Sequence, residues 1–249
     1  TRTELGSQLR RMFTSPEGCV LVDADYSQIE LRLLAHIAGD AEMQAAFRSG
    51  EDFHTVTASR VFHVPPEEVT PEMRRRAKAV NFGIVYGISA FSLAQDIGVS
   101  VAEAKAYMER YFETYQGVRQ YMTDVVAKAE QDGYVQTLMH RRRALPELKS
   151  SNFNLREFGK RVALNMPVQG TAADIMKLAM VRVHRRLKRE GLRARLLMQV
   201  HDELIVECPA SEQTQVERLL TEEMEQAASL SVPLIAEAHS GKNWLAAKE

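Results

Sequence analysis

Two acidic stretches far apart in the chain carry residue types that suit metal-dependent phosphoryl transfer. In the first, Val22–Glu30, Asp25 closely follows the apolar run Cys19–Val22; in the second, Asp202 and Glu203 are neighbours. Carboxylate oxygens are ligands that Mg²⁺ prefers, and two such ions ~3.5–4 Å apart can activate an attacking oxygen and stabilise a leaving one. We therefore expect a catalytic centre at these three carboxylates if the fold brings the two stretches together.

Each stretch also has a simpler interpretation. Asp25 and Ser27 could do no more than cap the helix that begins behind them, because Asp and Ser are preferred at helix N-termini. His201, beside Asp202, could be a zinc ligand. The neighbouring carboxylates favour a second interpretation, in which the site is magnesium-like and His201 orients a substrate.

The composition fits a globular chain and excludes several classes of protein. The 249 residues are 45% hydrophobic, enough for one large domain or two small ones. No apolar run approaches the roughly 18 residues that span a bilayer, so no membrane partner is expected. The N-terminal residues lack a signal-peptide pattern and read as if cut from a longer chain. The net charge is −1, so a surface for nucleic acid must come from local clusters, Arg74–Lys78 and Arg141–Arg143.

The two cysteines, Cys19 and Cys208, lack the Cys-x-x-Cys spacing of a zinc ribbon. Unpaired cysteines fit a reducing compartment, so we expect a cytoplasmic protein. Each cysteine lies six residues from one of the two aspartates, since 25 − 19 and 208 − 202 both equal 6. Adjacent antiparallel strands would therefore place the cysteines roughly opposite each other.

The chain between the two acidic stretches is predicted to be mostly helical. Apolar periodicity marks short helices over 40–62, a basic and glycine-weakened helical stretch over Met73–Tyr86, one or two long amphipathic helices over 100–131, and a helix over 153–165. A strand over Gly133–Leu138 and a basic loop over Arg141–Pro146 interrupt these helices.

The last third of the chain is more regular. The patterns predict, in order, a helix over Gly170–Arg189, a strand over Ala194–Val200, a tight turn at His201-Asp202, a strand over Glu203–Cys208, a helix over Ser211–Ala228 capped by Ser211, and a strand over Val232–Ala238. Counted from Cys19, this is the order of the split βαβ, ferredoxin-like fold with an insertion after the first strand. In that fold the third strand lies between the first two and is antiparallel to both. The topology therefore predicts that Asp25 and Asp202 converge at one edge of the sheet.

Three stretches, in this order, resemble the motifs of family A DNA polymerases, the bacterial DNA polymerase I type. Asp23–Glu30 resembles motif A, Arg74–Gly87 resembles motif B, and Gln199–Glu203 resembles motif C; Asn165–Asp174 is also similar to that family. Three ordered motifs are far more specific than any one of them. The resemblance covers nearly the whole chain and implies an α+β fold, in which a large helical fingers subdomain is inserted into a ferredoxin-like antiparallel palm sheet.

The resemblance implies template-directed DNA synthesis, in which deoxynucleotides are added to a primer 3′ end by two-metal phosphoryl transfer. It implies catalytic roles for Asp25, Asp202 and Glu203, and two Mg²⁺ ions held by Asp25, Asp202 and the main-chain carbonyl of Tyr26. Residues implied to bind the incoming nucleotide are Arg74, Lys78, Phe82, Tyr86, Glu30, His54 and Gln28. Residues implied to contact primer–template DNA are Arg161, Asn165, Gln169 and His201.

Several of these implied roles have a physical reason. Arg74 offers a fork of donors to the triphosphate and Lys78 offers a point charge. His54 would meet the β-phosphate side. Glu30 would block a ribose 2′-hydroxyl, with Tyr86 behind it.

The resemblance also divides the chain into palm over 1–39, helical fingers over 40–131, and palm over 132–249. The family places a thumb and an exonuclease-like domain before this point, and neither is present in the sequence. Expected partners are therefore primer–template DNA, deoxynucleoside triphosphates and those missing domains of a parent chain. Without them, the chain is expected to be weakly active.

Three other functions fit part of the pattern. A single-subunit RNA polymerase shares the two-aspartate palm, but Glu30 disfavours it because a bulky acidic side chain rejects ribose. A nucleic-acid-binding module without catalysis shares the strand order, but such modules stack bases on strand aromatics, which the two inner strands lack. A purely structural palm-like domain would not need Asp25, Asp202, Lys78 and Arg74 together.

Overall fold

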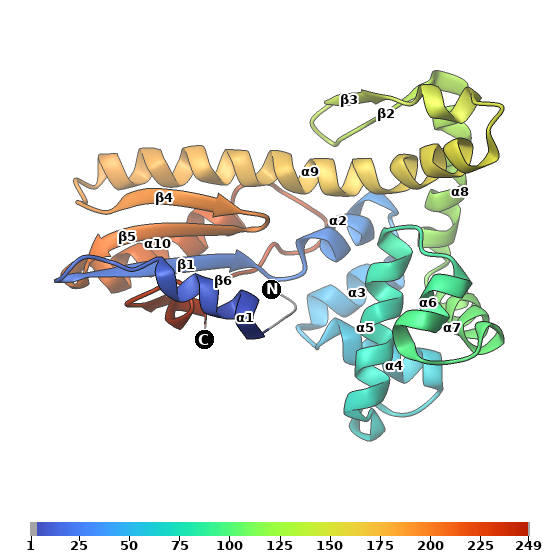
Figure 1. Cartoon of the computed structure of the whole chain (residues 1–249), viewed down its shortest axis with the longest axis horizontal. Helices are drawn as coiled ribbons and strands as arrows, with labels where there is room; N and C mark the ends of the chain where they lie inside the picture. The colour runs from blue at the N-terminus through green and yellow to red at the C-terminus, as the bar shows by residue number, and fades with distance from the viewer. Residues whose placement is uncertain (1–3, 249) are drawn as a thin grey trace. The chain divides into compact units, whose positions relative to one another are not determined.

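The computed structural model describes residues 4–248, which form two compact units. The sheet unit consists of residues 4–29, 172–229 and 234–248, and the helical unit consists of residues 30–171 and 230–233. Residues 1–3 and 249, which open and close the predicted palm segments, lie outside the described residues. Helix α9 (Phe153–Arg189) is continuous through the boundary at residue 171 and belongs in part to each unit (Figure 1).

The sheet unit contains four paired strands within its described residues. Its elements are α1 (Glu4–Gln8), the 3-10 turn η1 (Leu9–Met12), β1 (Cys19–Tyr26), the second half of α9, β4 (Arg195–Val200), β5 (Glu203–Pro209), η4 (Ala210–Glu212), α10 (Gln213–Glu225), β6 (Ala236–Gly241) and η5 (Ala246–Lys248). The strand order is β4-β5-β1-β6, and each neighbouring pair is antiparallel. Strand β5 therefore lies between β1 and β4, which confirms the predicted ferredoxin-like sheet.

Two predicted details of the sheet unit and one of α9 are wrong. The last strand spans Ala236–Gly241, not Val232–Ala238, because the preceding Pro233 cannot donate a ladder hydrogen bond. Helix α10 begins at Gln213 behind the turn η4, so Ser211 does not cap it. Helix α9 runs unbroken through Pro167, where we expected an interruption between residues 165 and 170.

Both faces of the central strands β1 and β5 are buried. One face packs on α10, where the Tyr26 hydroxyl donates a hydrogen bond to the Met224 carbonyl at 2.6 Å. On the other face Leu21 and Ile205 pack against Trp244 of the C-terminal segment. Because successive side chains of a strand point to opposite faces, Asp23 and Asp25 share the Leu21 face.

The register between β1 and β5 fixes which side chains face each other. Asp25 pairs with Glu203, and Val20 pairs with Cys208. Cys19 therefore lies one residue from the position opposite Cys208, so the cysteines are roughly opposite each other on adjacent strands, as predicted, although their side chains point to opposite faces of the sheet. Both cysteines are free thiols within the described part of the chain.

The helical unit begins with α2, whose first residue, Ile29, still belongs to the sheet unit. Its elements are α2 (Ile29–Ile37), α3 (Ala41–Ser49), α4 (Phe53–Phe62), η2 (Pro66–Glu68), α5 (Pro71–Val85), α6 (Ala90–Ile97), α7 (Val101–Thr114), α8 (Gln116–Asp132), β2 (Tyr134–Gln136), β3 (Arg142–Ala144), η3 (Pro146–Lys149) and the first half of α9. The expected helices over 40–62 and 100–131 are present. The segment predicted as a basic loop contains β3, which pairs with β2 in a hairpin.

The unit boundaries lie at residues 29 and 171, and the division into palm and fingers at residues 39 and 131 stays a prediction. A hydrophobic cluster after residue 131, in which Val135, Leu145 and Leu148 pack against Ala129 of α8 and Ala163 of α9, belongs to the helical unit. This cluster joins the hairpin and the first half of α9 to the helices before them.

One buried carboxylate caps two helices of the helical unit. Asp40 is 3% exposed, and its Oδ1 accepts from the Met43 amide at the start of α3 at 2.9 Å. Its Oδ2 accepts from the Gly117 amide at 2.8 Å and from the Val118 amide at 3.3 Å, at the start of α8. A Cβ on Gly117 would lie 2.9 Å from the Asp40 Cα, so only glycine allows this close approach.

We expect Asp40→Ala to lower the free energy of unfolding by about 2–4 kcal/mol. Each cap contributes roughly 0.5–2 kcal/mol, and the substitution leaves buried amides unpaired. Urea unfolding followed by circular dichroism measures the effect. Asp96→Ala, on an exposed position of α6, is the control and should change stability by less than about 0.5 kcal/mol. Equal stability of the two variants would contradict the double-cap interpretation.

Candidate functional site

The carboxylates of the two acidic stretches meet at the end of β1, as the topology predicted. The Tyr26 amide donates a hydrogen bond to the Asp202 carbonyl at 3.1 Å, which ties the turn between β4 and β5 to the end of β1. In the same ladder Asp25 lies opposite Glu203. Asp25, Asp202 and Glu203 therefore lie together although the first two are far apart in sequence.

A lysine that sequence reasoning did not select lies among these carboxylates. Lys248, in η5, places its ammonium 3.0 Å from Asp25 Oδ2 and 3.7 Å from Asp23 Oδ2, and in contact with Glu203 Oε2. Burial alone would lower the pKa of Lys248, but its contacts with Glu203 and Asp25 raise that pKa above the ordinary value. The ammonium therefore stays charged and offsets part of the local negative charge.

Two carboxylic acids of this cluster have raised pKa values. Burial, and then the charge of Glu203, raise the pKa of Asp23 to about 7, while Lys248 opposes the shift. Burial, and then the charge of Asp25, raise the pKa of Asp202 to about 6. An added cation would relieve both shifts because it favours the ionised forms.

The residues present fit a magnesium site of the predicted kind. Among the described residues, Asp25 Oδ1 is a buried oxygen without a hydrogen-bond partner. Asp25, Tyr26 and Asp23 also line a hollow of about 180 Å³. No three His, Cys, Asp or Glu side chains of residues 4–248 are grouped as metal ligands. An ion here would thus combine one or two carboxylates with carbonyl, water and substrate oxygens, which is the ligand set that Mg²⁺ accepts.

Two residues beside the cluster have a left-handed backbone that non-glycine residues rarely adopt. His201, in the turn before Asp202, has φ 52°, and Gln28 has φ 56°. The His201 carbonyl accepts from Gln199 Nε2 at 2.6 Å, which holds the turn. Strained residues of this kind gather at functional sites, and both were predicted to bind substrate.

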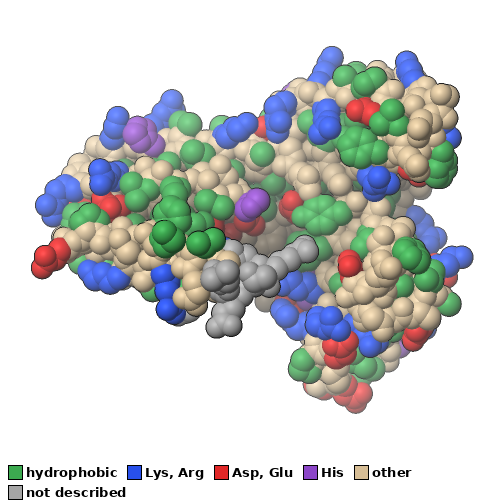
Figure 2. Space-filling model, viewed as in Figure 1, with side chains coloured by type: hydrophobic (Ala, Val, Ile, Leu, Met, Phe, Trp, Pro, Cys, Tyr) green, Lys and Arg blue, Asp and Glu red, His purple; other side chains and the backbone are tan. Residues whose placement is uncertain are grey.

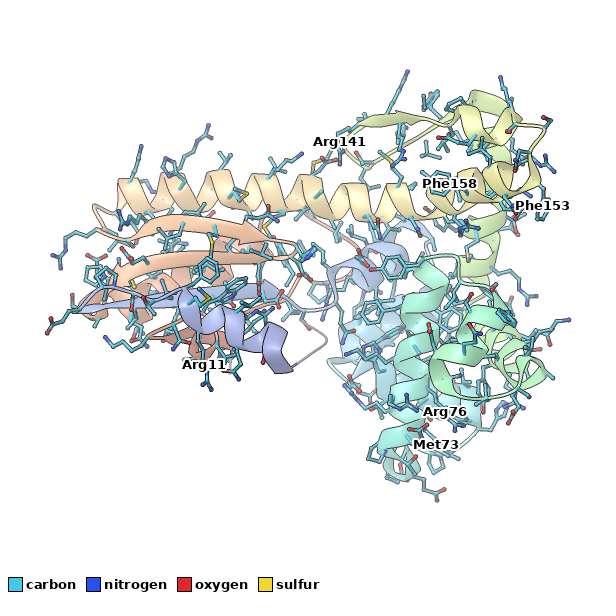
Figure 3. The ribbon with its side chains drawn as sticks, viewed as in Figure 1. Arg11, Met73, Arg76, Arg141, Phe153 and Phe158 are labelled. Carbon is cyan, nitrogen blue, oxygen red and sulfur yellow. The ribbon has the colours of Figure 1, made fainter. Side chains whose placement is uncertain are left out.

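In the helical unit, one face of α5 carries four residues predicted to bind the nucleotide. Arg74, Lys78, Phe82 and Tyr86 recur every four residues, the last directly after the helix, and so line one side of it. Arg75 and Arg76 instead form ion pairs with Glu72 at 2.7 and 2.9 Å. Arg76 lies toward the N-terminal end of α5 with Met73 (Figure 3).

Arg74 is held by Asp52, a residue that sequence reasoning did not select. Arg74 Nε and Nη2 donate to the two carboxylate oxygens of Asp52 at 2.7 and 3.1 Å. Asp52 also caps α4 through the Thr55 amide. Although burial raises it, the pKa of Asp52 falls to about 2 because of the hydrogen bonds from Arg74 and Thr55. An aspartate three residues before a threonine at a helix start is a capping signal that could have identified it.

His54 lies near this group and is buried against the Phe82 ring, at a centroid distance of 5.7 Å. Burial lowers the pKa of His54 to about 4; Asp52 opposes the shift, while Lys78 and Arg74 add to it. His54 is therefore a neutral imidazole at neutral pH. The structure thus brings Arg74, Lys78, His54 and Phe82 together.

Glu30 and Tyr86 are in direct contact, as the predicted pairing of the two requires. The Tyr86 hydroxyl donates to Glu30 Oε2 at 2.7 Å, and Tyr86 is 41% exposed. This hydrogen bond fixes the carboxylate of Glu30 at the start of α2, beside the end of α5.

The residues predicted to contact primer–template DNA on α9 share one face of that helix. Arg161, Asn165 and Gln169 recur every four residues. A Cβ on Gly87 would lie 3.4 Å from Arg161 Cγ, so the turn after α5 approaches this face closely. Arg141, from the hairpin, donates to the Gly170 carbonyl at 2.8 Å (Figure 3). Lys and Arg side chains are prominent on the surface around the hairpin (Figure 2).

No helix within residues 4–248 combines the length and apolarity needed to cross a membrane.

Comparisons with known proteins agree with these motifs. The sequence model of DNA polymerase family A matches residues 1–246. The chain is 54% identical over 248 residues to DNA polymerase I of Bacillus caldotenax and 53% identical over 248 residues to that of Bacillus subtilis. Each alignment covers 99% of this chain but only 28% of the relative. The polymerase domain of Pol1 from M. smegmatis, solved in complex with DNA primer-template and dNTP, superposes with a TM-score of 0.95 at 50% identity, covering 100% of this chain and 44% of that one.

The raised pKa of Asp23 predicts how stability depends on pH in Mg²⁺-free protein. The ordinary pKa is 3.8 and the folded value is about 7, so the folded state retains a proton that the unfolded chain has released. The resulting destabilisation grows as pH rises from about 4 to about 7 and is complete above that. We expect Asp23→Asn to raise the free energy of unfolding by about 1–3 kcal/mol above pH 7 and to leave it unchanged near pH 4. The gain is smaller than the free energy that corresponds to the whole pKa shift, because the ion pair with Lys248 is lost too.

Urea unfolding across this pH range, with Asp96→Asn as the matched control, measures the effect. A gain that does not depend on pH would contradict the assignment of the charge penalty to Asp23.

Proposed function

Because this chain belongs to DNA polymerase family A, we propose that it performs template-directed DNA synthesis, adding deoxynucleotides to a primer 3′ end by phosphoryl transfer. The observation that carries the proposal is the convergence of Asp25 and Asp202 at one end of the sheet, with a buried Asp25 oxygen that lacks a partner among the described residues. A fold alone would not require two like charges at this position.

Asp25, Asp202 and the main-chain carbonyl of Tyr26 would hold two Mg²⁺ ions. Such ions, when bound, supply charge stabilisation at the attacking and leaving oxygens of the transfer. Glu203 would support Asp25 from the facing ladder position, with its own charge partly offset by Lys248.

The helical unit would bind the incoming nucleotide. Asp52 engages Nε and Nη2 of Arg74, which leaves Nη1, on the other edge of the guanidinium, for a phosphate oxygen. Lys78 would add a point charge and His54 a neutral donor. The ring of Phe82 would pack on the sugar. Tyr86 would close the pocket by the templating base. Gln28, in the sheet unit, stays a separate prediction for nucleotide binding.

Primer–template DNA would be contacted by His201 and by the α9 face of Arg161, Asn165 and Gln169. The primer-template and dNTP in the complex of M. smegmatis Pol1 support the same partners for this chain. The chain spans 28% of the length of its curated relatives, and its net charge is −1. We therefore expect weak, strongly salt-dependent duplex binding and weak activity by the chain alone, since phosphate neutralisation dominates such affinity. Thumb and exonuclease-like domains would supply further contacts.

Two coarser assignments complete the proposal. The sheet unit would be the palm, and the helices of the helical unit would include the fingers. The free cysteines fit a reducing compartment, which supports a cytoplasmic protein.

Asp25→Ala and Asp202→Ala should each reduce primer extension by about 10³-fold or more, because a lost ligand removes several kcal/mol of charge stabilisation. The assay uses a labelled primer–template with Mg²⁺. The control, Asp96→Ala on α6, should retain the parent rate. Without Mg²⁺, Asp202→Ala should be no less stable than the parent, since the raised pKa of Asp202 reports an unfavourable charge. Extension within tenfold of the parent by either active-site variant would overturn the proposal.

Glu30→Ala should increase ribonucleotide incorporation relative to deoxyribonucleotide incorporation by roughly 10²-fold. The substitution opens space at the 2′ position and touches none of the three catalytic carboxylates. Tyr86→Phe is a graded companion, because it removes only the hydroxyl that fixes Glu30 and should shift the ratio less. The readout is the ratio of kcat/KM values for the two sugars. An unchanged ratio in Glu30→Ala would exclude Glu30 as the sugar gate.

A further inference from the structure

A buried hydrogen-bonded chain lies behind His54 in the helical unit. His54 Nδ1 is 3.0 Å from Asn81 Nδ2, and Asn81 Oδ1 accepts from Thr57 Oγ1 at 3.2 Å. Thr57 Oγ1 is in turn 3.2 Å from the Tyr115 hydroxyl. Asn81 and Thr57 are fully buried, and His54 is 3% exposed. Asn81 belongs to α5, which also carries Arg74 and Lys78.

The direction of this chain determines where His54 carries its proton. The Asn81 amide directs its oxygen to Thr57 and therefore its NH₂ group to His54. An NH₂ group can only donate, so His54 Nδ1 must accept. A neutral imidazole has one N–H, which then lies on Nε2.

We infer that Asn81 is a positioning residue of the nucleotide site, which holds His54 in the tautomer whose Nε2–H donates to a phosphate oxygen of a nucleoside triphosphate. The inference rests on the proposed function for the identity of the ligand, but the tautomer itself does not depend on it. In the other tautomer Nε2 would present a lone pair, which repels a phosphate oxygen. The buried amide thus selects the one neutral form of His54 that can bind an anion.

The two neighbouring cations make this selection matter. Arg74 and Lys78 both disfavour a positive charge on His54, and burial keeps the ring neutral. Protonation of the ring therefore cannot supply the donor at Nε2. The hydrogen bond at Nδ1 instead has to fix which nitrogen of the neutral ring carries the proton. The carboxylate of Asp52 is the opposing charge near the ring, and it is already engaged by Arg74 and Thr55.

The first test reads the tautomer directly, without any catalysis. The chain has seven histidines, so ¹⁵N-imidazole NMR spectra are recorded for the parent and for His54→Gln, and the missing resonance pair identifies His54. The expected pattern is that of an Nε2–H tautomer at neutral pH. Addition of a deoxynucleoside triphosphate should shift the His54 Nε2 resonance more than Nδ1. An Nδ1–H tautomer, or no shift on addition, would overturn the inference.

The second test reverses the hydrogen bond with a nearly isosteric change. In Asn81→Asp the carboxylate accepts from Nδ1–H and raises the pKa of His54. The imidazolium present at low pH still donates from Nε2, whereas the neutral ring at high pH presents a lone pair there. The KM of the variant relative to the parent should therefore rise about tenfold or more from about pH 6 to about pH 9, with a smaller change in kcat. A KM ratio that is flat with pH would overturn the inference.

Thr57→Ser is the matched control within the same buried chain. It keeps the hydroxyl that donates to Asn81 Oδ1 and leaves Asn81 against His54, so the Nε2–H tautomer and the pH profile of KM should match the parent. If the parent itself extends no primer, the proposed function fails, while the NMR titration still decides the inference about Asn81 and His54.

Discussion

The pairing of β1 with β5 is the constraint on which the rest of the sheet unit depends. Its register places Asp25 opposite Glu203 and lets the Tyr26 amide bond the Asp202 carbonyl, so one ladder assembles residues from both ends of the chain. A slip by one residue would move Asp23 and Asp25 to the α10 face, which is apolar. Burial of that face by Val22 and Ala24, both 0% exposed, therefore secures the geometry of the proposed catalytic site as well as the fold.

The ladder concentrates negative charge that the fold must tolerate. Burial and mutual repulsion raise the pKa values of Asp23 and Asp202. Among the described residues, the ammonium of Lys248 lies against this cluster. Such a partly compensated cluster is costly for a metal-free protein, but it favours cations that complete the compensation. The same repulsion among carboxylates thus destabilises the metal-free chain and favours the magnesium binding proposed for it.

The helical unit uses polar groups, of which Asp40 and Asn81 are buried, to direct side chains rather than to attract ions. Asp40 aligns the starts of α3 and α8, Asp52 caps α4 and directs Arg74, and Asn81 directs His54. Each group has at least two hydrogen-bond partners, and such hydrogen bonds restrict the conformations of the side chains that they join. Glu30 and Tyr86 add a contact of the same kind at the proposed sugar gate.

Local patterns in the sequence were enough for the order of the strands, for most helices and for the convergence of Asp25 with Asp202. They also supported the family resemblance, because the motifs are contiguous and their spacing is visible. Sequence reasoning predicted a break between residues 165 and 170 that α9 does not have; Met166 and Val168, on either side of Pro167, are buried, and their packing supports a continuous helix there. It also missed Lys248 and Asn81, since neither belongs to a pattern with its partners. Helical faces and caps depend on residues a few positions apart, so they can be predicted from the sequence. Ladder register and buried hydrogen bonds join residues that are far apart in the sequence and meet only in the folded chain.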